Sequence, residues 1–182
     1  MHGRYGAKRM KVSRRTFIVT GVTGAVALAA AAWLRGPHAS ATGIPRRALD
    51  ADGEALFAAV APVLLEGALP SETQARKVAL AETLAGIDTA VAGLTPGAQA
   101  ELRQLVALLA LPPVRFGIAR VHASWSDADP GEVRAFLDRS RNSSITLMRA
   151  AYDALHQLTF AAWYGNPKSW PAIGYPGPPR LS

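Results

Sequence analysis

The sequence contains no cysteine among its 182 residues, and this absence excludes several kinds of site. Without cysteine the chain has no disulfide, no catalytic thiol, no cysteine-bound iron–sulfur cluster and no covalently attached c-type haem. A chain without disulfides must be held together by its hydrophobic core. The part after residue 41 is long enough to form one domain around such a core.

Histidine is also scarce, since only His122 and His156 occur after residue 41. Neither has a second histidine at a His-x-x-x-His spacing, and no cysteine can complete a metal site. His156 follows Asp153 by three residues. On a helix, such a pair is more often a hydrogen-bonded structural pair than part of a metal site. We therefore predict no metal ligand in this chain.

The chain lacks a catalytic set drawn from separate elements. His122, Ser124 and Asp127 are the best triad-like group, but they lie in one short stretch, whereas triads are assembled from distant segments. The Gly-Tyr-Pro-Gly sequence near the C-terminus has no helix after it to bind phosphate, and no dinucleotide fingerprint follows a strand. We predict no catalytic and no cofactor-binding residue, so the chain itself is not an enzyme.

Acidic residues are absent from the first 41 positions, which hold seven of the 20 basic residues: Arg4, Lys8, Arg9, Lys11, Arg14, Arg15 and Arg35. Subtracting these seven leaves 13 basic against 13 acidic residues, so the rest of the chain is formally neutral although the whole carries +7. The basic excess therefore belongs to the N-terminal segment. It is no argument for nucleic-acid binding, which needs a basic face on the folded domain.

A pair of arginines within this segment indicates an export route. The pair stands in Ser13-Arg14-Arg15-Thr16-Phe17, directly before an apolar run. This spelling, with Ser13, Arg14, Arg15 and Phe17 as its recognised residues, resembles the twin-arginine export signal. Proteins that use this route are folded before transport, often with a cofactor bound. We therefore expect a periplasmic protein, with membrane association left open.

The apolar run covers the 17 residues from Ile18 to Leu34, and Ala39 and Ala41 then form an A-x-A cleavage site. The run is rich in Ala, Gly and Thr and is followed by Arg35, which suits the twin-arginine route better than the general secretory one. A transmembrane anchor is the alternative, but the run is at the short limit for a spanning helix. We prefer a cleaved signal, and an uncleaved signal that tethers the protein stays open.

From residue 50 onward, apolar residues recur at the three- and four-residue steps of amphipathic helices. In the first helix Asp50 or Asp52 is the expected N-cap, and Pro62 is expected to kink or break the helix. Ser71 and Gln74 spell a capping box for the second helix. The stripes of these two helices are Phe57, Val60 and Leu64, and Leu80, Leu84, Ile87, Val91 and Leu94.

A third helix is expected to begin at Thr95-Pro96, with threonine as N-cap and proline at the first helical position. No residue from Leu105 to Leu111 is polar, so we expect the end of this helix to be buried on all sides. Pro112 and Pro113 should stop it. A short helical stripe follows, made of Val114, Ile118, Val121 and Trp125.

Asp129-Pro130 repeats the cap-then-proline start, and Arg134 with Asp138 is expected to form an ion pair on the outer face of that helix. Asn142-Ser143-Ser144 is the expected cap of the last helix, which should run to about Trp163. Its wide apolar face predicts a central position in the bundle. Since no alternating strand pattern occurs, the predicted class is all-α, an irregular bundle of five or six helices.

The composition changes after this helix, since residues 163–179 contain five prolines, three glycines and four large aromatic residues. The prolines and glycines argue against helix, and the aromatics argue against disorder. The segment either packs on its own bundle as a lid or docks on a partner, for which Trp and Tyr are typical anchors. The candidate partner-binding residues are Trp163, Tyr164, Trp170 and Tyr175.

A twin-arginine signal, a small helical domain, Ala-Trp-Tyr-Gly-Asn-Pro and then Trp-Pro-Ala-Ile-Gly-Tyr-Pro-Gly-Pro-Pro follow one another along the chain. This order resembles the small subunits of periplasmic flavin dehydrogenases of the gluconate 2-dehydrogenase subunit 3 type. The resemblance covers most of the chain and is specific at its two ends. It implies a non-catalytic accessory subunit of an oxidoreductase complex.

The resemblance also implies the partners. The catalytic subunit would be a flavoprotein of the glucose–methanol–choline (GMC) type that lacks its own signal and holds FAD. The small subunit would bind it in the cytoplasm and carry it through the twin-arginine translocon. A cytochrome subunit in the complex is left open, and no nucleic acid is expected.

We therefore divide the chain into a signal over 1–41, a linker over 42–49, a helical domain over 50–164 and an extended tail over 165–182. Two alternatives from other classes stay open. One is a self-contained periplasmic enzyme or ligand-binding protein with a pocket between helices. The other is a membrane-tethered structural protein held by an uncleaved N-terminal helix.

Overall fold

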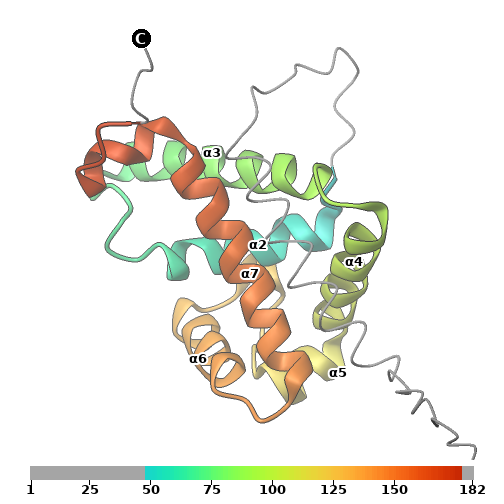
Figure 1. The fold of residues 1–182 in the computed structure, drawn as a ribbon. Helices are drawn as coiled ribbons and strands as arrows, with labels where there is room; N and C mark the ends of the chain where they lie inside the picture. The colour runs from blue at the N-terminus through green and yellow to red at the C-terminus, as the bar shows by residue number, and fades with distance from the viewer. Residues whose placement is uncertain (1–47, 178–182) are drawn as a thin grey trace, which may run out of the picture.

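A computed structural model describes residues 48–177, and in this range the chain is all-α (Figure 1). The predicted fold class is therefore confirmed. The predicted signal and cleavage residues Ser13, Arg14, Arg15, Phe17, Ala39 and Ala41 lie outside the described range. The elements are α2 (Ala51–Leu64), α3 (Thr73–Ala92), α4 (Pro96–Ala110), α5 (Pro112–Val114), the π-helix η1 (Arg115–Ala119), the 3₁₀-helix η2 (Trp125–Asp127), α6 (Pro130–Arg141), α7 (Thr146–Gly165) and the 3₁₀-helix η3 (Pro167–Ile173).

Helix α2 lies at the centre of the bundle, where it packs against α3, α4, α6, α7 and η2 (Figure 1). Leu56, Phe57 and Val60 are fully buried. No residue from Ala55 to Leu65 is polar, and a helix that is apolar all round is stable only when surrounded. We expected α7 to lie centrally among the other helices, and it packs against α2, α3, α6 and η3.

Helices α3 and α7 cross closely because small residues meet at the crossing. A Cβ added to Gly86 of α3 would stand 3.0 Å from the Cβ of Ala162 in α7, so a larger side chain would push the helices apart. Leu49 belongs to the same core, although we assigned it to the linker, and its N–H donates to Asp88 of α3 at 2.8 Å. The packed domain thus begins slightly before residue 50.

The predicted helix starts fall into two groups. Asp50, Thr95 and Asp129 each cap a helix by accepting backbone N–H groups, as expected. The capping box at Ser71 was wrong, because the Glu72 carboxylate accepts from the N–H groups of Gln74 and Ala75 and begins α3. The expected cap of α7 over residues 142–144 was also wrong, since α7 begins after Ile145 without a side-chain cap.

Three further predictions need correction. Pro62 stands inside α2, which continues to Leu64, so proline falls in the last turn and neither breaks the helix nor ends it. Arg134 pairs with Glu66 from the α2–α3 connection and not with Asp138. The helix expected to reach Trp125 ends at Ala119, because Arg120 adopts a left-handed backbone conformation with φ 51°.

The end of α4 is exposed on one side, contrary to the expectation that it is buried all round. Leu102, Val106 and Leu109 face the core, whereas Leu108 and Leu111 are exposed. Pro112 and Pro113 end α4 but also start α5, because proline is favoured at the first positions of a helix. Within residues 48–177 no single helix is long and apolar enough to span a membrane, and only the bent pair of α4 with α5–η1 passes by length and composition.

Candidate partner-binding surface

Helix α7 carries a row of neighbouring aromatic rings along one edge. Tyr152, His156, Phe160 and Tyr164 are spaced four residues apart, so they lie one above another on the helix. Their successive ring centroids are 5.5, 4.3 and 5.6 Å apart. The row was not predicted, although the Tyr-x₃-His-x₃-Phe-x₃-Tyr spacing is readable from the sequence.

The row is half-buried because the neighbouring face of α7 is packed into the core. Leu155, Leu158 and Ala162 on that face are almost fully buried. The last ring of the row, Tyr164, is 41% exposed. Aromatic rings that are braced by a core and still reach solvent lose little side-chain entropy when they bind a partner.

Trp163 differs from the other three predicted partner-binding residues, because it points into the bundle. It is buried in a small cluster with Leu65 and Leu69 of the α2–α3 connection. Its indole N–H has no acceptor among the residues that the structure describes. Trp163 therefore supports the base of the surface by packing.

The segment after α7 folds back as the 3₁₀-helix η3 and not as an extended tail. The prediction that its prolines exclude helix was wrong over Pro167–Ile173, because proline suits the first position of a helical turn. The Ser169 hydroxyl donates to the carbonyl of Trp163 at 2.7 Å, and the same carbonyl at the end of α7 also accepts the N–H of Asn166 at 3.2 Å. Gly174 has φ 68° and ends the turn, a conformation that glycine adopts without strain.

Trp170 and Tyr175 extend the aromatic surface beyond the end of α7. The Trp170 indole donates to the carbonyl of Tyr164 at 2.7 Å, and its ring meets that of Tyr175 edge to face at 5.2 Å. Tyr175 is 44% exposed, much like Tyr164. We call Tyr152, His156, Phe160, Tyr164, Trp170 and Tyr175 the aromatic surface.

The side chain of Glu82 in α3 holds η3 against the bundle through two contacts, which we call the Glu82 clasp. Its carboxylate accepts from the Asn166 side chain at 2.9 Å and from the Lys168 ammonium at 2.5 Å. The hydrogen bond from Lys168, followed by that from Asn166, lowers the pKa of Glu82 below its usual value. The tail is thus a lid on its own bundle, one of the two arrangements that we considered, and its outer aromatic rings still reach solvent.

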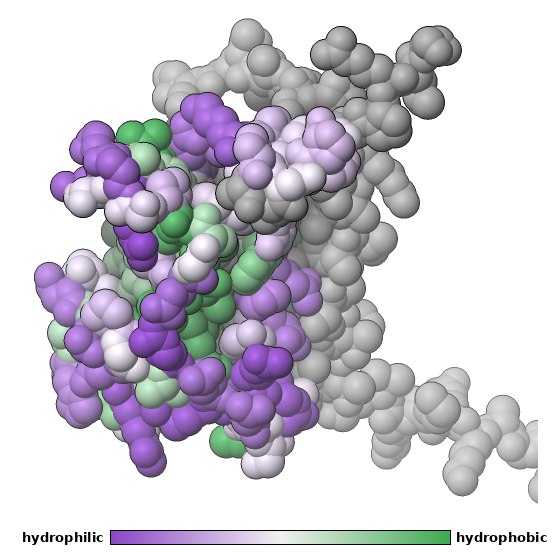
Figure 2. All heavy atoms as spheres, turned by 90° about the vertical axis from the view of Figure 1, so that its left-hand side faces the viewer, coloured by the Kyte–Doolittle hydropathy of each residue, from purple (hydrophilic) through white to green (hydrophobic). Residues whose placement is uncertain are grey.

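The face that carries η3 is mixed in character. Figure 2 views the molecule from the side where η3, the α2–α3 connection and α6 lie. Hydrophilic residues cover most of this face, and hydrophobic atoms appear in a strip between them. An apolar strip within a polar rim is the usual composition of a protein–protein interface.

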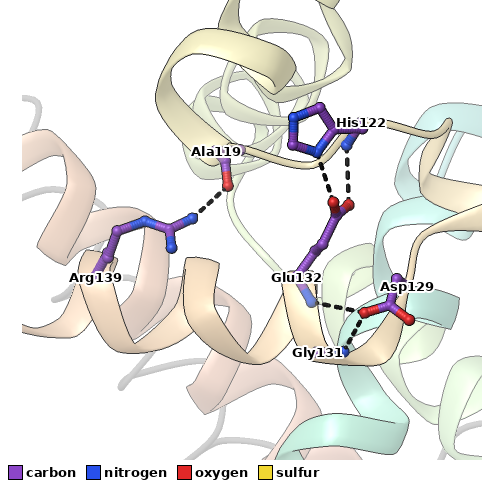
Figure 3. A network of polar contacts seen from close by, with 6 residues as sticks. All are labelled: Ala119, His122, Asp129, Gly131, Glu132 and Arg139. Atoms are coloured by element: carbon purple, nitrogen blue, oxygen red, sulfur yellow. Dashed lines mark hydrogen bonds and ion pairs between the residues drawn. The ribbon is translucent and has the colours of Figure 1, made fainter.

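The triad-like group is not assembled. The His122 ring pairs with Glu132 of α6 at 2.5 Å, and the His122 N–H donates to the same carboxylate at 3.0 Å (Figure 3). The backbone N–H of His122, and then its ring, lower the pKa of Glu132. The Ser124 hydroxyl donates instead to Asp127. The contacts of His122 tie the loop before η2 to α6, whereas the Ser124 hydrogen bond lies within the loop and η2.

His156 was considered together with Asp153, and no hydrogen bond joins these two residues in the described structure. The imidazole lies between the Tyr152 and Phe160 rings of the aromatic surface. Burial lowers the pKa of His156, and the charge of Asp153 offsets part of this effect. We expect His156 to act as an aromatic ring, in its neutral form, at neutral pH.

Other features that could hold a small ligand are limited. Within residues 48–177 no group of three or more His, Cys, Asp or Glu side chains is placed to hold a metal ion. A cavity of about 430 Å³ lies where the start of α2 meets α3, lined by Leu49, Glu54, Ala81, Leu84, Ala85, Asp88 and Thr89. Its size is within the range of small-molecule sites.

Comparisons of the chain with protein-family models, with curated proteins and with solved structures found no match.

Proposed function

We propose that this chain is a non-catalytic accessory subunit of a periplasmic flavin-dependent dehydrogenase. It would carry a signal-less flavoprotein of the GMC type through the twin-arginine translocon and stay bound to it. FAD would belong to the partner. The proposal starts from the resemblance at the two ends of the sequence, and the aromatic surface on α7 and η3 is the observation that supports it most directly.

The aromatic surface suits a stable complex with a folded cargo. Tyr and Trp are the residues that most often dominate binding energy at protein interfaces, and Tyr164 and Tyr175 are exposed at neighbouring points of one surface. The Glu82 clasp and the Ser169 hydrogen bond hold η3 in place before any partner arrives. A preorganised surface loses less entropy on binding, which favours the long-lived complex that transport requires.

The export part of the proposal can be tested separately from the interface. Changing Arg14 and Arg15 together to lysine keeps the charge but removes the pair that the twin-arginine route recognises. We expect both this chain and its flavoprotein to remain in the cytoplasm. Normal periplasmic accumulation of the double variant would contradict the twin-arginine interpretation.

The interface can be tested by co-production with a signal-less flavoprotein encoded beside this chain, followed by pull-down from the periplasm. Tyr164→Ala combined with Tyr175→Ala should leave this chain folded and exported, while the flavoprotein stays in the cytoplasm. Val78→Ser, on the exposed side of α3, is the matched control and should change neither. A flavoprotein that reaches the periplasm with the tyrosine variant would overturn the proposed interface.

The isolated chain tests the enzyme alternative. We expect it to be purified without bound flavin or metal and to turn over no sugar or alcohol. A flavin spectrum or stoichiometric metal in the isolated chain would favour the self-contained enzyme or ligand-binding protein. In that case the cavity between α2 and α3 would be the first place to search.

A further inference from the structure

The bend between α4 and η1 exposes a second group of apolar side chains. Leu108, Leu111, Phe116 and Ile118 are 36%, 51%, 46% and 51% exposed, and we call these four residues the α4–η1 corner. Gly117 between the last two also faces open space, since a Cβ there would meet no atom within 4 Å. Contiguous exposed apolar side chains mark surfaces that bind a protein or a membrane.

The sequence around the corner is that of a buried segment. No residue from Leu105 to Leu111 is polar, which is why we expected burial on all sides. The core covers Val106 and Leu109, but at the C-terminal end of α4 the opposite side, with Ala107, Leu108 and Leu111, is exposed and apolar where a solvent-facing helix would be polar. The segments described by the structure therefore do not cover this side.

The charges beside the corner have one sign. Between Glu101 and Asp127 the chain has no acidic residue, and its charged residues there are Arg103, Arg115 and Arg120. The Arg115 guanidinium lies 5.0 Å from the centre of the Phe116 ring. Arg139 of α6 adds a further cation, because it donates to the carbonyl of Ala119 at 2.7 Å (Figure 3).

The backbone presents these residues at an edge of the bundle. The axes of α4 and of α5–η1 differ in direction by 73°, and the exposed prolines Pro112 and Pro113 stand at the break. Figure 1 shows α4 and α5 at the border of the fold, with α4 packed against α2. Arg120, in its left-handed conformation, ends η1 and leaves its side chain exposed beside Ile118 in the sequence.

We propose that the α4–η1 corner docks on the surface of an anionic lipid bilayer. Leu111, Phe116 and Ile118 would enter the boundary between headgroups and acyl chains, and Arg115 and Arg120 would lie at the level of the lipid phosphates. Aliphatic and phenyl side chains flanked by arginines are the composition of interfacial membrane-binding segments. The proposal goes beyond the carrier role and does not depend on the identity of the partner.

A lipid surface fits the corner better than a protein does. Energetically dominant positions at protein interfaces are rich in Trp, Tyr and Arg and poor in Leu. The corner has arginines beside it, but it exposes leucine, isoleucine and phenylalanine without Trp or Tyr. Arg103, Arg115 and Arg120 have no acidic residue between them in the sequence, which complements an anionic bilayer.

A site-specific probe can test the proposal in the full chain, because the sequence has no cysteine to compete for labelling. Ile118→Cys would be labelled with an environment-sensitive fluorophore and mixed with vesicles of phosphatidylcholine, with or without phosphatidylglycerol. We expect the emission to shift to shorter wavelength only with the anionic vesicles. Val78→Cys is the control, because Val78 is exposed to the same extent as Phe116 and lies on α3.

This comparison separates docking of the corner from binding by the N-terminal segment, which every variant shares. Binding by that segment alone would leave the probe at position 118 in water. We further expect Arg120→Asn, whose new side chain tolerates the left-handed backbone, to weaken binding to anionic vesicles about fivefold. Lys77→Gln should have a smaller effect.

Two results would overturn the proposal. One is a probe at position 118 that stays in water when anionic vesicles are present. The other is a probe that is shielded by the co-produced flavoprotein and not by lipid, because the corner would then be a protein interface. The tyrosine variants of the aromatic surface should not alter the response at position 118, so failure of this proposal and failure of the carrier proposal are distinguishable.

Discussion

The aromatic surface and the α4–η1 corner both expose apolar side chains, but they are built differently. Five of the six rings of the aromatic surface carry polar atoms, and η3 is fixed by hydrogen bonds to Glu82 and to the carbonyl of Trp163. The corner consists of hydrocarbon side chains, and its charged neighbours are arginines. Rings with fixed polar groups favour a specific protein partner, whereas hydrocarbon beside arginine favours a surface without fixed geometry.

Local sequence explains how each surface arises. In α7 the aromatic residues recur every fourth position, and the four-residue step brings them to one edge of the helix. At the corner Pro112 and Pro113 end one helix and start the next, so the chain bends before its apolar stretch is fully buried. The aromatic surface thus follows from the four-residue spacing of rings in α7. The α4–η1 corner follows from the prolines that interrupt an apolar stretch.

The largest expected effect is a loss of folding stability. It tests whether packing of Trp163 in the core supports the aromatic surface. Trp163→Ala should lower the free energy of unfolding by about 3–5 kcal/mol, because it empties a packed site beside Leu65 and Leu69. Trp163→Phe should be much milder, since it keeps most of the ring and removes an indole N–H without an acceptor among the described residues. Denaturant unfolding measures both. A change of less than about 1 kcal/mol in the unfolding free energy of Trp163→Ala would show that this residue does not support the surface.

The second prediction separates binding from stability. Tyr164→Ala should weaken the complex with the flavoprotein by about 2 kcal/mol if it is a dominant contact. Its free energy of unfolding should change by less than about 1 kcal/mol, because the residue is 41% exposed and lies outside the core. Phe116→Ser at the corner is the counterpart and should leave partner affinity unchanged. Equal weakening of the complex by both variants would contradict the claim that only the aromatic surface binds the flavoprotein.

The third prediction concerns the Glu82 clasp, in which the Glu82 carboxylate accepts hydrogen bonds from Asn166 and Lys168. The folded-state pKa of Glu82 is below its ordinary value of 4.5, so its stabilising contribution is present above pH 4.5 and is lost as the pH falls through the lower folded value. We expect amide hydrogen exchange in η3 to speed up in this acidic range. Glu82→Gln should show faster exchange already at neutral pH, while α4 and η1 behave as in the parent protein.

The smallest effect concerns His156. Burial lowers its folded-state pKa below 6.5, so the unfolded chain binds the proton more readily. Stability is therefore fully present above pH 6.5 and declines slightly as the pH falls towards the folded-state pKa. His156→Phe should remove this slope while preserving the row of rings. Unfolding measured at several pH values would show it, and an unchanged slope in the variant would contradict the assignment.

Much of the helical framework could be read from the sequence because it depends on neighbours along the chain. Asp50, Thr95 and Asp129 stand next to the N–H groups that they cap, so their roles are local. Arg134 was assigned to Asp138 by the same local reasoning, but Glu66 lies closer in the folded chain. The candidate surface was found in part, since Tyr164, Trp170 and Tyr175 were expected and the row below them was not.

The sequence by itself determined the all-α class, the apolar stripes and three of the helix caps, because helix periodicity and capping act over a few residues. Tertiary structure alone decided that α2 is central, that Trp163 faces inward while Tyr164 faces out, and that η3 is clasped by Glu82. It also decided which side of α4 stays exposed. These outcomes depend on contacts between segments far apart in the chain, and a spacing pattern holds no information about which surface meets which.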